Sequence, residues 1–157
     1  QGRSLDRDRE GLQTPRQEAS EGREGLIMIE ALIAYLLADS GLTALVSTRI
    51  GYVVNDQATA DPRVTITPVS RVPAYADDGE AGLTETRVQI DSYSTVDTNA
   101  LAISRAVFAR LSAVSATLSG VDFQTVHLVS EDVGFEKYDD GSELFRVRQD
   151  YIIWHNA

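Results

Sequence analysis

The stretch Leu83-Thr-Glu-Thr-Arg-Val-Gln-Ile-Asp-Ser-Tyr93 alternates between two kinds of side chain along its length. Thr86, Val88 and Ile90 fall on one side, and Arg87, Gln89 and Asp91 fall on the other. Strict alternation is typical of a β-strand that buries one face and leaves the other polar. We therefore expect this segment to be a strand in a sheet with one apolar face.

The C-terminal region predicts a hairpin. Phe123 to Val133 forms one arm, Leu144 to Trp154 forms the other, and Tyr138-Asp-Asp-Gly-Ser between them is a strong turn signal. In the last arm apolar side chains share one face and charged ones share the opposite face: Phe145, Val147, Tyr151 and Ile153 against Arg146, Arg148 and Asp150.

Further strands are expected before the opening stretch. Arg63-Val-Thr-Ile-Thr67 alternates in the same way, and Ile50 to Val54 is a short strand candidate. Pro68 and Pro73 favour an edge or bulged strand, because proline cannot donate a backbone hydrogen bond. We expect two polar loops, the second of them long and acidic: Asn55 to Asp61 and Pro73 to Gly82.

Two segments carry apolar residues at helical spacing, residues 28–38 and residues 97–118. Leu42, Leu45 and Val46 allow one further helical turn after the first. The fold class that follows is α+β, a mostly antiparallel sheet of four to five strands with two helices packed on one face. We expect the core to contain Leu32, Leu36, Val88, Ile90, Ile103, Val107, Leu111, Val147 and Ile153.

The first 27 residues differ from the rest in composition. They contain five Arg, six Asp or Glu, and four Gly, and they bury too little apolar area to offset the entropy of ordering them. We expect residues 1–27 to be a flexible extension, or sequence translated from upstream of a start at Met28. The alternative is an arm that orders against a neighbouring subunit. Residues 28–157 then form a single domain.

Composition excludes several classes of function. The 157 residues carry a formal charge of −10 and no cysteine, which rules out disulfide scaffolds, thiolate zinc sites and cysteine nucleophiles. The acidic balance argues against general affinity for nucleic acid, which needs a basic face. No apolar run approaches the roughly 20 residues of a membrane span, so we expect no membrane partner.

The sequence contains no clear catalytic or metal-binding motif. There is no glycine-rich phosphate loop followed by Lys-Ser or Lys-Thr, and no Gly-x-Ser-x-Gly turn. Asp77-Asp78-Gly79 and Asp139-Asp140-Gly141 lack the alternating oxygen ligands of a calcium loop. His127 and His155 are better explained as structural residues. We expect no enzyme activity, no cofactor and no metal; a small enzyme or ligand-binding domain of this fold class is the alternative.

The outward strand positions favour assembly over reaction. Asp91 and Asp150 fit a solvated or interface face better than a catalytic pair. Arg146, Arg148 and Trp154 are residue types that contact nucleic acid, but in so acidic a chain a charged face that meets a neighbouring subunit explains them better. The candidate assembly residues, which include members of both polar loops, are Asn55, Asp56, Tyr75, Asp77, Asp78, Glu80, Arg87, Asp91, Arg146 and Arg148.

A family resemblance rests on a series of segments, in chain order: Met28-Ile-Glu-Ala-Leu-Ile-Ala-Tyr-Leu-Leu, Leu45-Val-Ser-Thr-Arg-Ile50, Asp61-Pro-Arg-Val-Thr-Ile66, Val88-Gln-Ile-Asp-Ser-Tyr93, the helix from Ala100 to Leu111, and Tyr138-Asp139 leading to Arg146-Val-Arg-Gln-Asp-Tyr-Ile-Ile-Trp154. Through these segments, the span from Met28 to His155 resembles the tail-terminator, or tail-completion, proteins of long-tailed bacteriophages (siphoviruses), prophages and gene-transfer particles.

The resemblance implies a structural virion protein with no catalytic residues. Proteins of this kind form a hexameric ring at the head-proximal end of the tail tube, stop tube polymerisation and join the tail to the head. The implied partners are further copies of the chain, the tail tube protein and the head–tail connector or stopper, with DNA passing through the lumen without specific binding. The implied location is the neck of a virion that assembles in the cytoplasm of a bacterial host. A head-side stopper or adaptor of the same neck is a close alternative.

Overall fold

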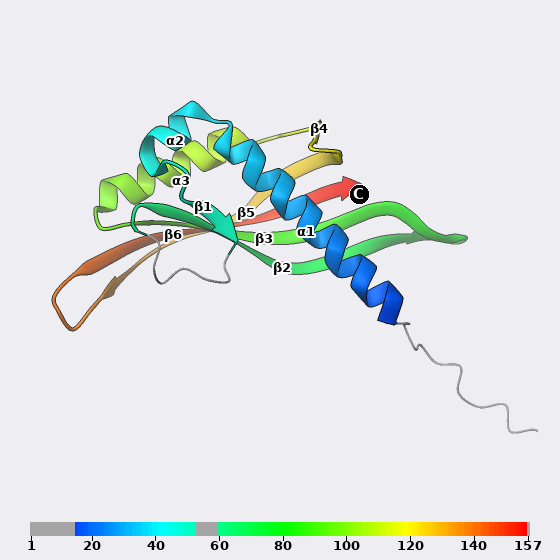
Figure 1. The fold of residues 1–157 in the computed structure, drawn as a ribbon, viewed down its shortest axis with the longest axis horizontal. Helices are drawn as coiled ribbons and strands as arrows, with labels where there is room; N and C mark the ends of the chain where they lie inside the picture. The colour runs from blue at the N-terminus through cyan, green and yellow to red at the C-terminus, as the bar shows by residue number, and fades with distance from the viewer. Residues whose placement is uncertain (1–14, 53–59, 157) are drawn as a thin grey trace, which may run out of the picture.

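The computed structural model describes residues 15–52 and 60–156. Within them, three helices cover one face of a single sheet (Figure 1): α1 (Pro15–Leu37), α2 (Ser40–Val46) and α3 (Asp97–Leu111). The strands of that sheet are β1 (Ile50–Tyr52), β2 (Arg63–Ala76), β3 (Gly79–Ser94), β4 (Ala116–Leu118), β5 (Val121–Lys137) and β6 (Glu143–Asn156). The α+β class and the placement of the helices on one face are confirmed.

The sheet is larger than expected and is mixed. Its described strands follow the spatial order β1-β2-β3-β6-β5-β4, six strands where four to five were expected. The pair β1 and β2 is parallel, and all other neighbours are antiparallel. Both outermost strands are only three residues long: β1, which was expected within Ile50 to Val54, and β4, which was not expected.

The pairing register confirms which side chains face the helices. On β3, Val88 pairs with Tyr151 of β6 and Ile90 pairs with Ile66 of β2. All four side chains lie in the core between the sheet and the helices. Every residue expected in the core is buried: Leu32, Leu36, Val88, Ile90, Ile103, Val107, Leu111, Val147 and Ile153.

The first helix begins at Pro15, so the expected start at Met28 is wrong. Gln17, Glu18, Ala19 and Glu21 are good helix formers, and proline is favoured in the first turn. The segment therefore continues the helix by backbone propensity, although it lacks an apolar face. In Figure 1, α1 crosses the sheet and its first turns extend beyond β2.

The expected helix over residues 97–118 is too long, because α3 ends at Leu111 and residues 116–118 form β4. Val114 and Leu118 keep the helical spacing, but they also suit a strand, in which every second residue shares a face. The turn at Ser119-Gly120, where both residues have positive φ, joins β4 to β5 rather than ending a helix.

The expected acidic loop from Pro73 to Gly82 is also wrong. β2 and β3 stay paired almost to their ends, with Ala76 opposite Gly79, so that only Asp77 and Asp78 form the turn. Gly79 has a φ of +133°, a conformation that suits glycine. The other expected loop, Asn55 to Asp61, lies mostly outside the described residues. The β2–β3 and β5–β6 hairpins project at opposite ends of the sheet (Figure 1).

Candidate assembly surface

The sheet face without helices, which we call the open face, gathers charged side chains from β3 and β6. The register sets Asp91 opposite Arg148, Tyr93 opposite Arg146, and Gln89 opposite Asp150. These residues alternate with core residues along both strands, so their side chains share the side away from the helices. The outward positions expected from the sequence are confirmed.

Asp91 lies at the centre of the open face and is only 2% exposed. Its Oδ1 accepts a hydrogen bond from Arg146 Nε at 2.8 Å, and Arg148 Nε is 4.0 Å from the same oxygen. Gln89 Nε2 donates to Oδ2 at 2.8 Å. The hydrogen bond to Asp91 raises the pKa of Arg146 above its ordinary value, so that this arginine keeps its charge at all accessible pH values.

Further contacts hold charged side chains in place on the same face. Arg87 donates to Asp150 Oδ2 at 2.8 Å, and Ser130 Oγ on β5 is 3.4 Å from that oxygen. The guanidinium of Arg63 lies 4.4 Å from the centre of the Tyr93 ring, a cation–π distance. Burial raises the pKa of Tyr93, which therefore stays neutral near pH 7. Ion pairs and stacking thus hold these side chains within one subunit.

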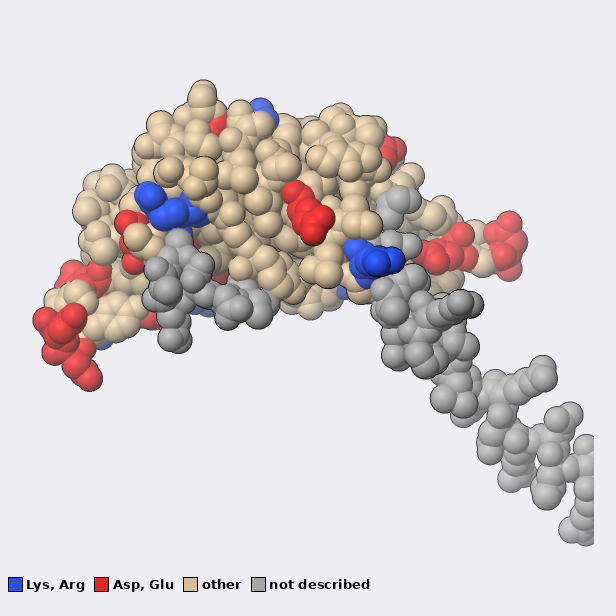
Figure 2. All heavy atoms as spheres, in the orientation of Figure 1, with Lys and Arg blue, Asp and Glu red and all other residues tan. Residues whose placement is uncertain are grey.

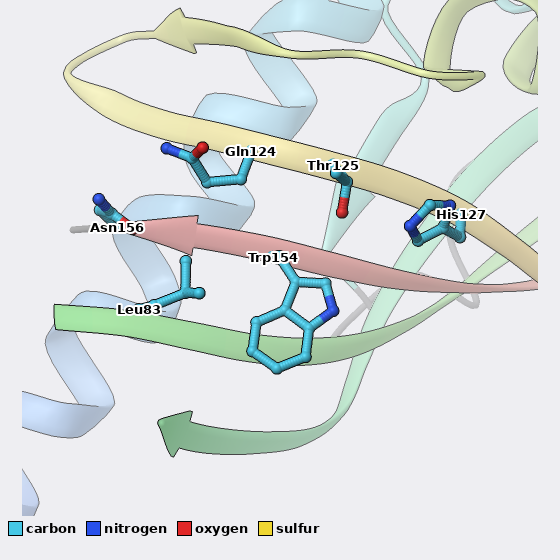
Figure 3. A pocket seen from close by; sticks show the side chains of 6 residues that line it. All are labelled: Leu83, Gln124, Thr125, His127, Trp154 and Asn156. Carbon is cyan, nitrogen blue, oxygen red and sulfur yellow. The ribbon is translucent and has the colours of Figure 1, made fainter. Parts of the chain in front are cut away.

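Toward the C-terminal end of β6 the open face becomes a shallow depression of about 550 Å³. Figure 3 shows the residues that line it, which project from three neighbouring strands on the side away from α1: Leu83, Gln124, Thr125, His127, Trp154 and Asn156. The lining offers one imidazole and several amide or hydroxyl groups without a carboxylate, which gives it no paired acid and base.

The two histidines lie on opposite faces of the sheet. His127 pairs with Ile152 and lines the depression on the open face. His155 is buried on the helix side, where its Nε2 is 2.9 Å from Thr86 Oγ1. Burial lowers the pKa of His155 to about 4, so it is neutral near pH 7. The structure therefore brings no histidine pair together. No group of three or more metal-ligating side chains occurs in the described ranges.

The expected assembly residues separate into two groups. The structure brings Arg87, Asp91, Arg146 and Arg148 together on the open face. Tyr75, Asp77, Asp78 and Glu80 lie at the tip of the β2–β3 hairpin, where all four are exposed. Asn55 and Asp56 fall outside the described residues.

Charge also gathers at the hairpin ends. Figure 2 shows acidic side chains clustered at both projecting ends of the molecule. Gln89 and Arg63 lie on the open face, where the alternating pattern placed them, and Tyr93 lies beside them, although none of the three was among the expected assembly residues. The exposed apolar side chains of β5, among them Val133 and Phe135, were not expected from the sequence either.

Three helices over one sheet face, a charged open face and two exposed hairpins define a small protein of the α+β class. The chain belongs to the tail completion protein family: the family described as "Tail completion protein gp17" matches residues 30–156. Membership of this family makes it a component of a virion tail.

A solved structure supports the fold. The chain is similar to a chain of the structure described as "Virion of native gene transfer agent (GTA) particle", with a TM-score of 0.64 and 18% identity. The match covers 82% of this chain and 93% of that chain. No curated protein matches.

Among the described residues no single helix is long and apolar enough to cross a membrane. The helical segments Gly25–Leu37 and Ser40–Val46 are long and apolar enough only when they are taken together, and the chain bends between them. Leu32, Leu36, Leu42 and Val46 of this pair are fully buried in the protein core.

Proposed function

We propose that the protein forms a ring, a hexamer by the family resemblance, at the head-proximal end of a tail tube. There it ends tube polymerisation and joins the tail to the head connector, as a structural rather than a catalytic component. The observation that carries this proposal is the family match across residues 30–156, because it concerns completion of the tail. The virion assembles in the cytoplasm of its bacterial host.

The arrangement of the surfaces supports a protein with several partners. A subunit of a terminal ring needs one surface for its neighbours, one for the tube and one for the head. The described part of the chain offers the open face and two hairpins that project at opposite ends. We assign the β2–β3 tip, with Tyr75, Asp77, Asp78 and Glu80, to a contact with the tube or the connector.

DNA passes through the lumen of the ring without specific binding. The chain carries a formal charge of −10, and the arginines Arg87 and Arg146 on the open face are already bound to carboxylates. A surface of this kind repels phosphate backbones and leaves few cations to hold them.

The test uses particle-producing cells that lack this chain, with tail lengths measured by electron microscopy. The proposal predicts overlong tails that are not joined to heads, and rescue by the wild-type chain. Normal-length tails without heads would instead assign the chain to the head side of the neck. Joined tails of normal length would contradict the proposal.

A hairpin variant refines the test. Replacing residues 74–81 with a short Gly-Ser linker removes the β2–β3 tip, and the subunit should stay folded because these residues lie outside the core. Particles that carry this variant should show overlong or unjoined tails. A matched control replaces the tip of the other hairpin, residues 138–142, with the same linker.

A further inference from the structure

Most of strand β5 is exposed although it carries large apolar side chains. β4 pairs only with Val121–Phe123, and no other described strand lies on that side of β5. Every residue from 127 to 137 is exposed, including Val133 at 65% and Phe135 at 64%. An uncovered apolar strand edge of this length is an aggregation hazard unless a partner covers it.

The direction of the backbone groups on the opposite edge of the sheet follows from one hydrogen bond. The N–H of Val64 donates to the carbonyl oxygen of Arg49 at 2.9 Å, on the side of β2 away from β3. Successive residues of a strand direct their backbone groups to opposite sides. Thr65 therefore faces β3, where it pairs with Asp91.

The same alternation continues across the sheet to β5. Ile90 faces β6 and pairs with Gln149, so Arg148 faces β5 and pairs with Asp132. Val133 then directs its N–H and C=O outward, away from β6. The odd-numbered residues 131–137 share this orientation, and none of them is proline. β5 thus presents intact backbone donors and acceptors at its outer edge.

The outer edge of β2 has the opposite character. β1 pairs only with Val64–Ile66, and no strand among the described residues lies beside residues 67–76 on that edge. Pro68 takes an outward position by the alternation that starts at Val64, and Pro73 follows further along the strand. These residues keep their carbonyl acceptors but have no N–H. Val72, exposed at 56%, adds apolar surface to this edge.

Charge and hydrogen bonding make each edge unsuited to its own copy. Residues 124–137 of β5 carry Glu131, Asp132 and Glu136 against the single Lys137, so this excess of negative charge makes two β5 edges repel each other. Two β2 edges would both lack donors at their prolines. Residues 67–76 carry Arg71 and no acid, so β5 and β2 attract, and donors on β5 meet carbonyls on β2.

We propose that β5 of one copy pairs with β2 of the next copy, so that the sheet continues from subunit to subunit. Three antiparallel steps separate the two strands within a copy, so β5 and β2 run in opposite directions. A head-to-tail repeat therefore joins them as an antiparallel pair, the more favourable type, and such a repeat gives a ring when the rotation between copies closes. This inference rests on the ring of the proposed function and assigns its subunit contact.

Cysteine cross-linking tests the pairing, because the natural chain contains no cysteine. Ser70→Cys on β2 and Ser130→Cys on β5 are near-isosteric, and both residues are exposed on the open face. Each variant alone and the mixture of both are assembled, alone or with tube protein, and treated with a flexible bifunctional maleimide. The inference predicts covalent dimers in the mixture and not in either single variant.

Each other outcome has a distinct meaning. Dimers from one variant alone would show like edges meeting and would overturn the inference. An assembled ring without any cross-link would also overturn it, while leaving the ring intact. A wild-type chain that forms no ring under any of these conditions would overturn the proposed function, and the inference with it.

A backbone variant provides an independent measure. Val133→Pro removes an outward N–H that the subunit does not use, whereas Asp132→Pro removes one that faces β6 and serves as the control for misfolding. Val133→Pro should keep the wild-type circular dichroism spectrum and unfolding midpoint but weaken ring formation by about tenfold or more. Val133→Lys, a charge on the edge, should do the same. Folded variants that form rings as well as the wild type would overturn the inference.

Discussion

Arg146 on β6 reaches diagonally to Asp91 on β3, past its register partner Tyr93, and its Nε donates to Asp91 Oδ1 at 2.8 Å. The carboxylate is nearly inaccessible although it lies on the sheet face that has no helices. The arginine side chain covers it and remains partly exposed itself. The open face is therefore held together by charge where the opposite face is held together by apolar packing.

Substituting Asp91 should destabilise the subunit. Asp91→Asn removes the charge shared by Arg146 and Arg148, and leaves two cations side by side. We expect the free energy of unfolding to fall by about 1–3 kcal/mol, less than for a fully buried pair because both arginines reach solvent. Asp150→Asn is the matched control, since its partner Arg87 is more exposed, and should cost less than about 1 kcal/mol. Equal losses in urea unfolding would contradict this account of the face.

The buried His155 should make stability depend on pH. Its pKa is about 4 in the folded state against an ordinary value of 6.5, so between these values the unfolded chain binds a proton that the folded chain does not. The contribution is full above about pH 6.5 and is lost as the pH falls toward 4, by up to about 3 kcal/mol. His155→Gln should remove this dependence, and His127→Gln should retain it. The measurement is the urea unfolding midpoint of the wild type and both variants across this pH range. A wild-type curve that matches His155→Gln would refute the assignment of the pH dependence to His155.

Residues 1–27 should be dispensable for folding, as their composition predicts. The core begins at Met28 and Ile29, whereas Leu26 and Ile27 are exposed. A chain that starts at Met28 should lose no more than about 1 kcal/mol, which for this size is roughly 2–4 °C in the unfolding midpoint. A fall of many degrees would show that α1 needs its first turns.

The chain should not bind DNA tightly. Filter binding at low salt should give no micromolar complex, because the arginines of the open face are paired with carboxylates. Asp150→Asn releases Arg87 from its ion pair and should increase DNA retention relative to the wild type. Micromolar binding of DNA by the wild type would contradict this prediction and would indicate that Arg146 and Arg148 form a phosphate-binding patch.

The central strands were predictable because one face is buried. Alternation at period two identified both faces of β3 and β6, and these two strands place Arg87, Asp91, Arg146 and Arg148 together. The apolar stripe through Ile103, Val107 and Leu111 identified the buried face of α3 in the same way.

Elements without a buried face were harder to predict. The start of α1 depends on helix propensity without amphipathic pattern, and the β2–β3 tip carries the Pro, Asp and Gly typical of loops although its backbone stays paired. β4 shares its spacing with the end of a helix. The open edge of β5 could not be recognised, because exposure of Val133 and Phe135 depends on which strands flank them in space.

The mass of the purified chain in solution, with and without tail tube protein, tests the central claim most directly. The account predicts a closed ring of defined copy number, either from the chain alone or once tube protein is present. A chain that remains a monomer or dimer at high concentration, and does not enlarge when tube protein is added, would contradict it.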